Sequence, residues 1–154
     1  MSNLKIYTKS ILIPVILGAI IGIMISGSMD YEMLEKPFLS PPSWLFPVVW
    51  TILYILMGVS YGIIKSKNLD NISIKTIYYA QLITNLAWPI FFFVFKWRFF
   101  AFLWILLLVG LVIKMIIEFY KENRVAGLLQ IPYLVWLIFA IYLNLGVYLL
   151  NYNL

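Results

Sequence analysis

Five long, uninterrupted apolar stretches constrain this chain more than any other feature of its sequence. They cover residues 6–26, 44–64, 74–95, 99–117 and 126–150. Each is long enough to cross a bilayer as a helix, which takes about 20 apolar residues. A spanning β-barrel would instead need many strands of about ten residues with alternating polarity, and these stretches do not alternate. The sequence therefore predicts an all-α integral membrane protein, a bundle of five transmembrane helices.

The composition agrees with this prediction and excludes most classes of enzyme. Of the 154 residues, 64% are hydrophobic and 11% charged, whereas soluble domains are about half apolar and a quarter charged. The connections leave no room for a soluble domain, so residues 1–154 are expected to form a single membrane domain. The chain has no cysteine and no histidine, which removes zinc sites, haem ligation by imidazole and serine–histidine–aspartate catalysis. We expect no metal and no cofactor.

The net charge of +5 indicates topology and not nucleic-acid binding, because the basic residues lie at the ends of the apolar stretches. Eight of the 11 Lys and Arg residues lie on the side of the N-terminus, and only Lys36, Lys96 and Arg98 lie on the other. This difference favours a cytoplasmic N-terminus. Lys5 and Lys9 before the apolar core of the first stretch would also suit a signal peptide, but we expect the stretch to remain as a span.

The connection at residues 27–43 is longer than the others and contains Pro37, Pro41 and Pro42. Proline fixes φ and holds the preceding residue in an extended conformation. Long ordered loops in compact proteins are more often functional lids than spacers. We therefore predict a semi-rigid lid at residues 27–43, with a short helical turn around residues 31–35.

Polar and aromatic side chains share single faces on three of the predicted helices. On the third helix the face is Gln81, Thr84, Asn85 and Trp88; on the second it is Trp50, Tyr54, Gly58 and Tyr61; on the fifth it is Tyr133, Trp136, Ala140, Asn144 and Tyr148. Residues at this spacing lie one above another on a helix. Together they predict aromatic walls with amides between them, suited to a flat hydrophobic ligand with a few polar edges. The alternative is that the amides only hydrogen-bond between helices.

Four segments have an order and spacing that match those of a known membrane-protein family. They are residues 31–37 (YEMLEKP), 41–50 (PPSWLFPVVW), 81–88 (QLITNLAW) and 132–144 (PYLVWLIFAIYLN). The chain closely resembles the translocator protein family (TspO/MBR), also called tryptophan-rich sensory proteins or peripheral benzodiazepine receptors. The resemblance implies a five-helix, homodimeric protein, here of a bacterial cell membrane, that binds tetrapyrroles such as protoporphyrin IX and haem. It also implies a cytosolic C-terminus, which opposes the charge count, so the orientation stays open.

The resemblance implies a ligand site made of Tyr31 in the lid and of Trp50, Asn85, Trp88, Trp136, Ala140 and Asn144. Its Trp50 and Trp136 match tryptophans linked to porphyrin photochemistry in the family. The expected partners are a porphyrin or another flat hydrophobic molecule, membrane lipid and a second copy of the chain, with no nucleic acid.

Three functions remain open at this point. The first is a binding protein for tetrapyrrole sensing or handling. The second is an enzyme that degrades porphyrin with light and oxygen, with Trp50 and Trp136 as its reactive groups. The third is a transporter of porphyrin or sterol, which is disfavoured because no charged residue lies in the middle of a span. The chain also departs from the family at Asp30 and Leu39, where many members have tryptophan.

Overall fold

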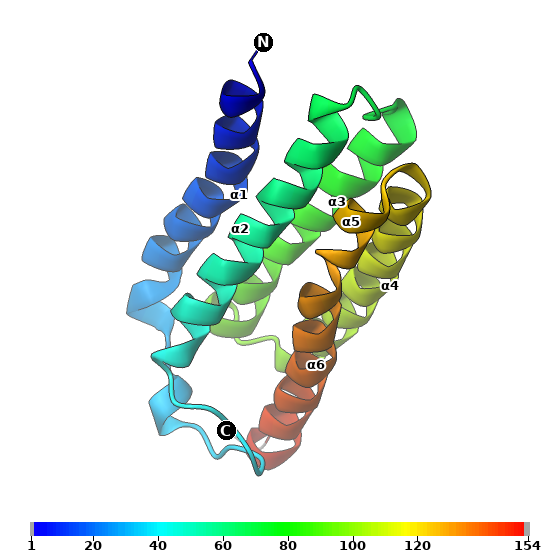
Figure 1. Ribbon diagram of the computed structural model, residues 1–154. Helices are drawn as coiled ribbons and strands as arrows, with labels where there is room; N and C mark the ends of the chain where they lie inside the picture. Colours follow the sequence, from blue (N-terminus) through cyan, green and yellow to red (C-terminus); the bar gives the residue numbers. More distant parts are fainter. Residues whose placement is uncertain (1, 153–154) are drawn as a thin grey trace.

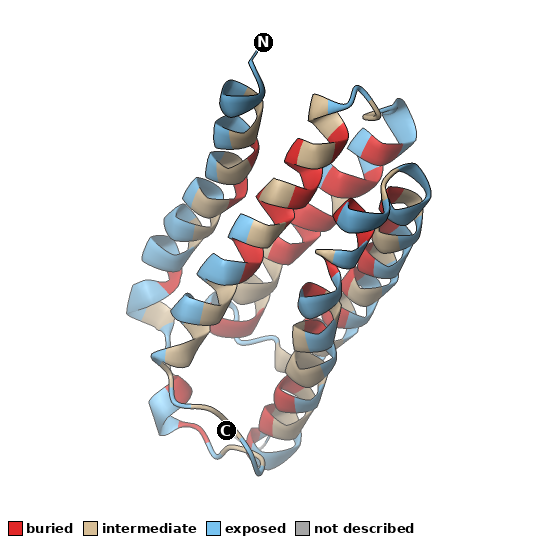
Figure 2. Cartoon of the chain, viewed as in Figure 1, coloured by how far each residue is buried: buried red, intermediate tan, exposed pale blue. Residues whose placement is uncertain are grey.

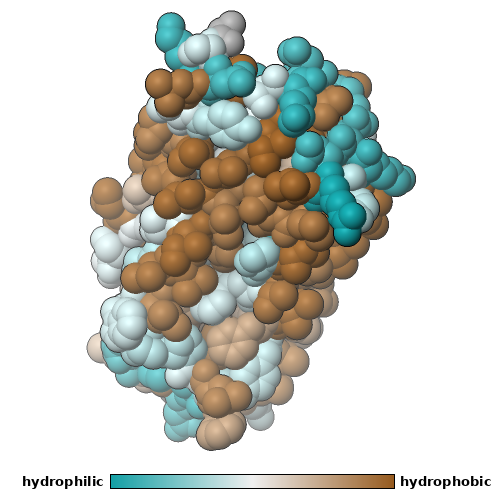
Figure 3. Space-filling view, viewed as in Figure 1, coloured by the Kyte–Doolittle hydropathy of each residue, from teal (hydrophilic) through white to brown (hydrophobic). Residues whose placement is uncertain are grey.

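Five long helices run side by side in the computed structural model, which describes residues 2–152 (Figure 1). They are α1 (Asn3–Ile25), α2 (Leu45–Ser66), α3 (Ile72–Pro89), α4 (Arg98–Glu122) and α6 (Ile131–Asn151). Each lies in a segment long and apolar enough to span a membrane. Figure 3 shows a broad hydrophobic band between more hydrophilic ends. The predicted all-α bundle of five transmembrane helices is confirmed.

The prediction of one continuous helix over residues 126–150 was wrong. The structure has a short helix α5 (Arg124–Leu128), a turn, and then α6. Pro132 lies in the first turn of α6, where it has no N–H to offer the carbonyl of Leu128 and its ring would clash with that carbonyl in a continuous helix. The side chain of Asn123 caps α5 by accepting a hydrogen bond from the N–H of Ala126 at 3.0 Å.

The other helix ends differ from the prediction by a few residues. Helix α4 continues to Glu122, because its last turns are amphipathic and good helix formers, although they are not apolar. Helix α3 ends at Pro89 and passes directly into the π-helix η3 (Ile90–Val94), since Pro89 cannot donate the hydrogen bond that an α-helix needs there.

Helices α1 and α2 approach each other at two glycines of α2. A Cβ atom on Gly58 would lie 2.4 Å from the Cα of Ile11, and one on Gly62 would lie 2.7 Å from the ring of Tyr7. The absence of side chains thus brings the two backbones together. The opposite side of α1 is exposed over most of its length (Figure 2).

We call the end of the bundle that carries residues 27–43 the lid end and the opposite end the far end. In Figure 1 the lid lies at the bottom, near the C-terminus, and the N-terminus lies at the top. The lid contains two 3-10 turns, η1 (Ser26–Ser28) and η2 (Tyr31–Met33). The second confirms the predicted helical turn, although it ends earlier than residue 35.

Candidate ligand-binding site

A cavity of about 550 Å³ lies in the lid half of the bundle, lined by the lid and by parts of α1, α2, α3, η3, α4 and α6. This volume is typical of small-molecule sites, which range from about 300 to 1,000 Å³. The cavity wall includes all seven predicted site residues: Tyr31, Trp50, Asn85, Trp88, Trp136, Ala140 and Asn144. Within residues 2–152, no charged side chain lines it.

Aromatic rings from three helices form the walls. The ring of Trp50 lies 5.7 Å from that of Tyr54 on α2, and Trp136 on α6 meets Phe46 edge-on at 6.0 Å. Trp88 on α3 stacks on Phe92 at 4.9 Å. Separations in this range are those of favourable aromatic pairs, so the walls are preorganised by contacts with one another.

The amide of Asn85 lies at the centre of a hydrogen-bonded chain. Its Oδ1 accepts from the hydroxyl of Tyr54 at 2.6 Å, and its Nδ2 donates to the hydroxyl of Tyr133 at 2.7 Å. The Tyr133 hydroxyl then donates to Oε1 of Gln81 at 2.9 Å. An amide has two donors and can accept twice, so Asn85 keeps one N–H and one lone pair for a ligand. Asn85 thus links three helices and also lines the cavity.

Asn144 connects the cavity wall to the start of α4. Its Oδ1 accepts from Nε1 of Trp88 at 2.9 Å, and its Nδ2 donates to the backbone carbonyl of Arg98 at 2.8 Å. The side chain is buried. Asn144 therefore fixes the orientation of the Trp88 ring that faces the cavity.

The indole N–H of Trp136 is buried and has no hydrogen-bond partner among residues 2–152. Buried donors in proteins are nearly always paired, and an indole nitrogen can only donate. Because Trp136 lines the cavity, its N–H is available to an acceptor on a bound molecule.

Tyr31 closes the lid end of the cavity. It is only 6% exposed, and its ring meets Phe46 edge-on at 5.0 Å. Its hydroxyl donates to the carbonyl of Pro41 at 2.7 Å, while the ammonium of Lys36 lies 4.7 Å above its ring. Burial raises the pKa of Tyr31 above its usual value of 10.0.

The second half of the lid is tied to the end of α6. The side-chain amide of Asn151 accepts from the N–H of Glu35 at 3.1 Å and donates to its carbonyl at 2.7 Å. The ring of Pro37 packs against Gly146, where a Cβ atom would come within 2.6 Å of it. These contacts bring together residues that are more than 100 positions apart in the sequence.

The first half of the lid is held by an ion pair that we call the lid latch, formed by Asp30 and Arg98. One guanidinium nitrogen of Arg98 lies 2.8 and 2.6 Å from the two carboxylate oxygens of Asp30. The guanidinium also lies 5.1 Å from the centre of the Phe92 ring. Since Phe92 and Asn144 both line the cavity and both contact Arg98, the latch is joined directly to the cavity wall.

The sequence matches the TspO/MBR family over residues 10–150. The chain belongs to this family. It is 39% identical over 122 residues to the tryptophan-rich protein TspO of Archaeoglobus fulgidus, covering 79% of both chains. It is 32% identical over 133 residues to the tryptophan-rich sensory protein of Cereibacter sphaeroides, covering 86% of this chain and 83% of that one. The human translocator protein is 33% identical over 132 residues, covering 82% and 78%. The expected family and the multi-pass membrane location are thereby confirmed.

Several wall residues of this TspO/MBR protein were missed in the sequence, among them Phe46, Phe92 and Phe93. Phe46 lies one helical turn before Trp50, and Phe92 lies one turn after Trp88. Both could have been found by extending the aromatic faces by four residues. The latch has no such signal, because Asp30 and Arg98 are 68 positions apart.

Proposed function

We propose that this TspO/MBR protein binds a porphyrin-type tetrapyrrole, such as protoporphyrin IX or haem, beneath the lid, for tetrapyrrole sensing or handling. The observation that carries the proposal is a single cavity with aromatic walls from three helices and no charged wall residue within residues 2–152. A flat conjugated macrocycle gains stacking on such walls in addition to burial. A sensory role agrees with the name of the relative from Cereibacter sphaeroides, a tryptophan-rich sensory protein.

The polar groups of the cavity would orient the ligand. Trp136 offers an unused N–H and Asn85 keeps one N–H and one lone pair, so both can pair with nitrogen or carbonyl groups at the ring edge. Ionised carboxylates of a tetrapyrrole would be costly to bury between uncharged walls. They would therefore lie at the water-facing lid end.

Filling the cavity tests this proposal. Ala140 lines it on α6, whereas Val135 on the same helix is 60% exposed on the outer surface. We expect Ala140→Trp to weaken protoporphyrin IX binding at least tenfold, as measured by titration of the purified protein in detergent with tryptophan fluorescence, and Val135→Trp to leave it unchanged. If a folded Ala140→Trp protein binds protoporphyrin IX with unchanged affinity, the porphyrin does not bind in this cavity.

A second function, photodegradation of the bound porphyrin with light and oxygen, is supported by the position of two indoles on one cavity. Trp50 and Trp136 both line it, and indole is more easily oxidised than phenylalanine. The double variant Trp50→Phe, Trp136→Phe keeps aromatic walls. We expect it to retain bound protoporphyrin IX but to lose most of any light-dependent decay of the porphyrin absorption band. Equal decay in parent and variant would leave binding as the function.

A further inference from the structure

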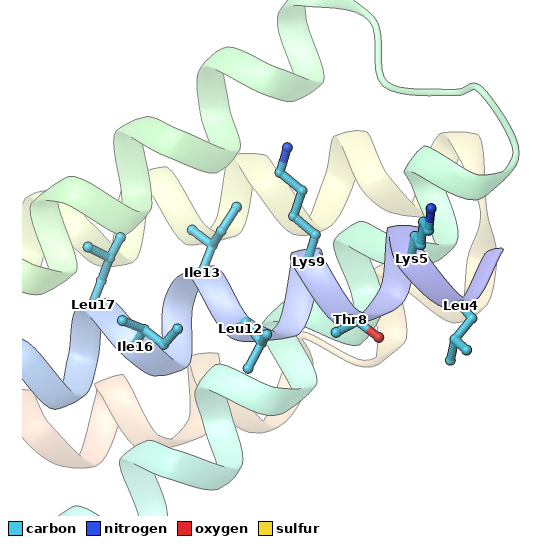
Figure 4. Close-up of a pocket in the computed structure, with 8 residues that line it drawn as sticks. All are labelled: Leu4, Lys5, Thr8, Lys9, Leu12, Ile13, Ile16 and Leu17. Atoms are coloured by element: carbon cyan, nitrogen blue, oxygen red, sulfur yellow. The ribbon is translucent and has the colours of Figure 1, made fainter. Parts of the chain in front are cut away.

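A groove runs along the outer face of α1, separate from the cavity under the lid. It is open on its outer side, has a volume of about 710 Å³ and is lined by Leu4, Lys5, Thr8, Lys9, Leu12, Ile13, Ile16 and Leu17. These residues form two adjacent rows at intervals of four, which are the ridges of a helix surface. In Figure 4, Lys9, Ile13 and Leu17 project to one side of α1, and Leu12 and Ile16 to the other.

The groove faces away from the contact with α2. That contact uses Tyr7, Ile11 and Gly18, which lie against Gly62, Gly58 and Tyr54. By contrast, Leu12 is 46% exposed and Ile16 is 49% exposed. Within residues 2–152, no other part of the chain covers Leu12 and Ile16, so this face of α1 is exposed to the membrane.

The charges of the groove are confined to one end. Lys5 and Lys9 are exposed and, within residues 2–152, neither takes part in an ion pair. Thr8, whose side chain carries a hydroxyl, lies between them in the sequence. Only apolar side chains follow from Leu12 to Leu17. A ligand matching this pattern has an anionic group at one end and a hydrocarbon chain at the other.

The length of the groove fits one leaflet of a bilayer. At a rise of 1.5 Å per residue, Leu4 to Leu17 spans about 20 Å. Half of the hydrocarbon core is about 15 Å thick. Lys5, about 18 Å from Leu17 along the helix, lies beyond that thickness at the level of the lipid headgroups. Lys9, about 12 Å from Leu17, reaches the same level by extending its flexible side chain. Such lysines attract anionic lipid headgroups.

We propose that this groove is a binding site for one anionic phospholipid. The phosphate lies at Lys5 and Lys9 with Thr8 as a further donor, and an acyl chain lies along Leu12, Ile16 and Leu17. A second copy of the chain is a poorer occupant, because a symmetric contact through this face would bring the lysines of both copies together. The proposal does not depend on tetrapyrrole binding.

The first test removes the charges. Native mass spectrometry of the protein in detergent, with equal amounts of phosphatidylglycerol and phosphatidylcholine, measures which lipid stays bound. We expect one phosphatidylglycerol to be preferred, and the double variant Lys5→Gln, Lys9→Gln to bind it about 30-fold more weakly, the effect of losing two cationic contacts. The matched control is Lys65→Gln, Lys67→Gln, which removes the same charge at the far end but outside the groove.

Two outcomes of this test would overturn the proposal. One is that the Lys5, Lys9 variant retains phosphatidylglycerol as well as the parent does. The other is that the control variant loses as much, because the attraction would then belong to the whole basic surface and not to the groove.

The second test fills the apolar end. We expect Leu12→Trp to lower phosphatidylglycerol retention, whereas Met24→Trp, at a 63% exposed position of α1 outside both the groove and the cavity under the lid, should not. Circular dichroism checks that each variant is folded. The chain has no cysteine, so Thr8→Cys introduces a single thiol at the groove. Efficient disulfide crosslinking of Thr8→Cys in membranes would show a second copy on this face and refute the lipid site.

Discussion

The far half and the lid half of the bundle use the same kind of side chain in opposite ways. In the far half, the rings of Tyr61 and Tyr78 stack at 4.1 Å with only 6° between their planes, and Phe119 beside them is fully buried. In the lid half, Trp50 and Trp136 are only partly buried and line a cavity. Aromatic content alone therefore does not distinguish core from binding site.

The boundary between the halves is the hydrogen-bonded chain from Tyr54 through Asn85 and Tyr133 to Gln81. It joins α2, α3 and α6 at one level of the bundle. Because the far half holds these helices together tightly, the lid half can remain hollow without collapsing. We infer that stability resides mainly in the far half and ligand binding in the lid half.

The largest expected effect is on the free energy of unfolding, and it should distinguish the far half from the lid half. Phe119→Ala removes a fully buried ring and should lower the free energy of unfolding by about 3–5 kcal/mol. Trp50→Ala should cost less than half as much, because its ring is already partly exposed to the cavity. Unfolding in mixed micelles titrated with sodium dodecyl sulfate measures both. Equal losses would remove the distinction between the halves.

A smaller effect is expected at the boundary itself. Asn85→Leu leaves the hydroxyls of Tyr54 and Tyr133 without their amide partner, which should cost about 1–3 kcal/mol of unfolding free energy. Adding Tyr54→Phe should recover part of this loss, since it removes one of the unpaired hydroxyls. Strictly additive losses in the double variant would show that the two side chains are not coupled.

Kinetics should distinguish the ion pairs at the two ends. Asp30→Asn weakens the lid latch and should speed dissociation of protoporphyrin IX about tenfold with little change in association, as expected when contacts that close a bound state are lost. Asp70→Asn, which breaks the far-end pair with Lys75, is the control and should change neither rate. Stopped-flow fluorescence measures both. A slower association with unchanged dissociation would contradict a latch.

The smallest effect concerns the stiffness of the lid. Replacing Pro41 and Pro42 by glycine adds freedom to the open chain and should speed dissociation about threefold. The carbonyl of residue 41 still accepts from Tyr31 after the change, so the anchor of the lid is kept. If dissociation is as slow as in the parent, the lid is held by its contacts alone and its prolines are dispensable.

The parts of this structure that could be predicted from sequence are those encoded along single helices. The five apolar stretches and the face through Gln81, Asn85 and Trp88 follow from hydropathy and helical spacing. The break before α6 was missed although Pro132 signals it, because an apolar run was equated with one helix. The pairing of Asp30 with Arg98 could not be found, since it depends on where the lid comes to rest.

The contact between Pro37 and Gly146 shows what the lid requires of the helix on which it rests. A Cβ atom at position 146 would overlap the proline ring, so the lid sits in a notch that exists because one residue has no side chain. Closure is thus controlled by steric exclusion as well as by attraction. Across related sequences, the size of the residue at this position would reveal whether a lid can settle onto its last helix or is held away from it.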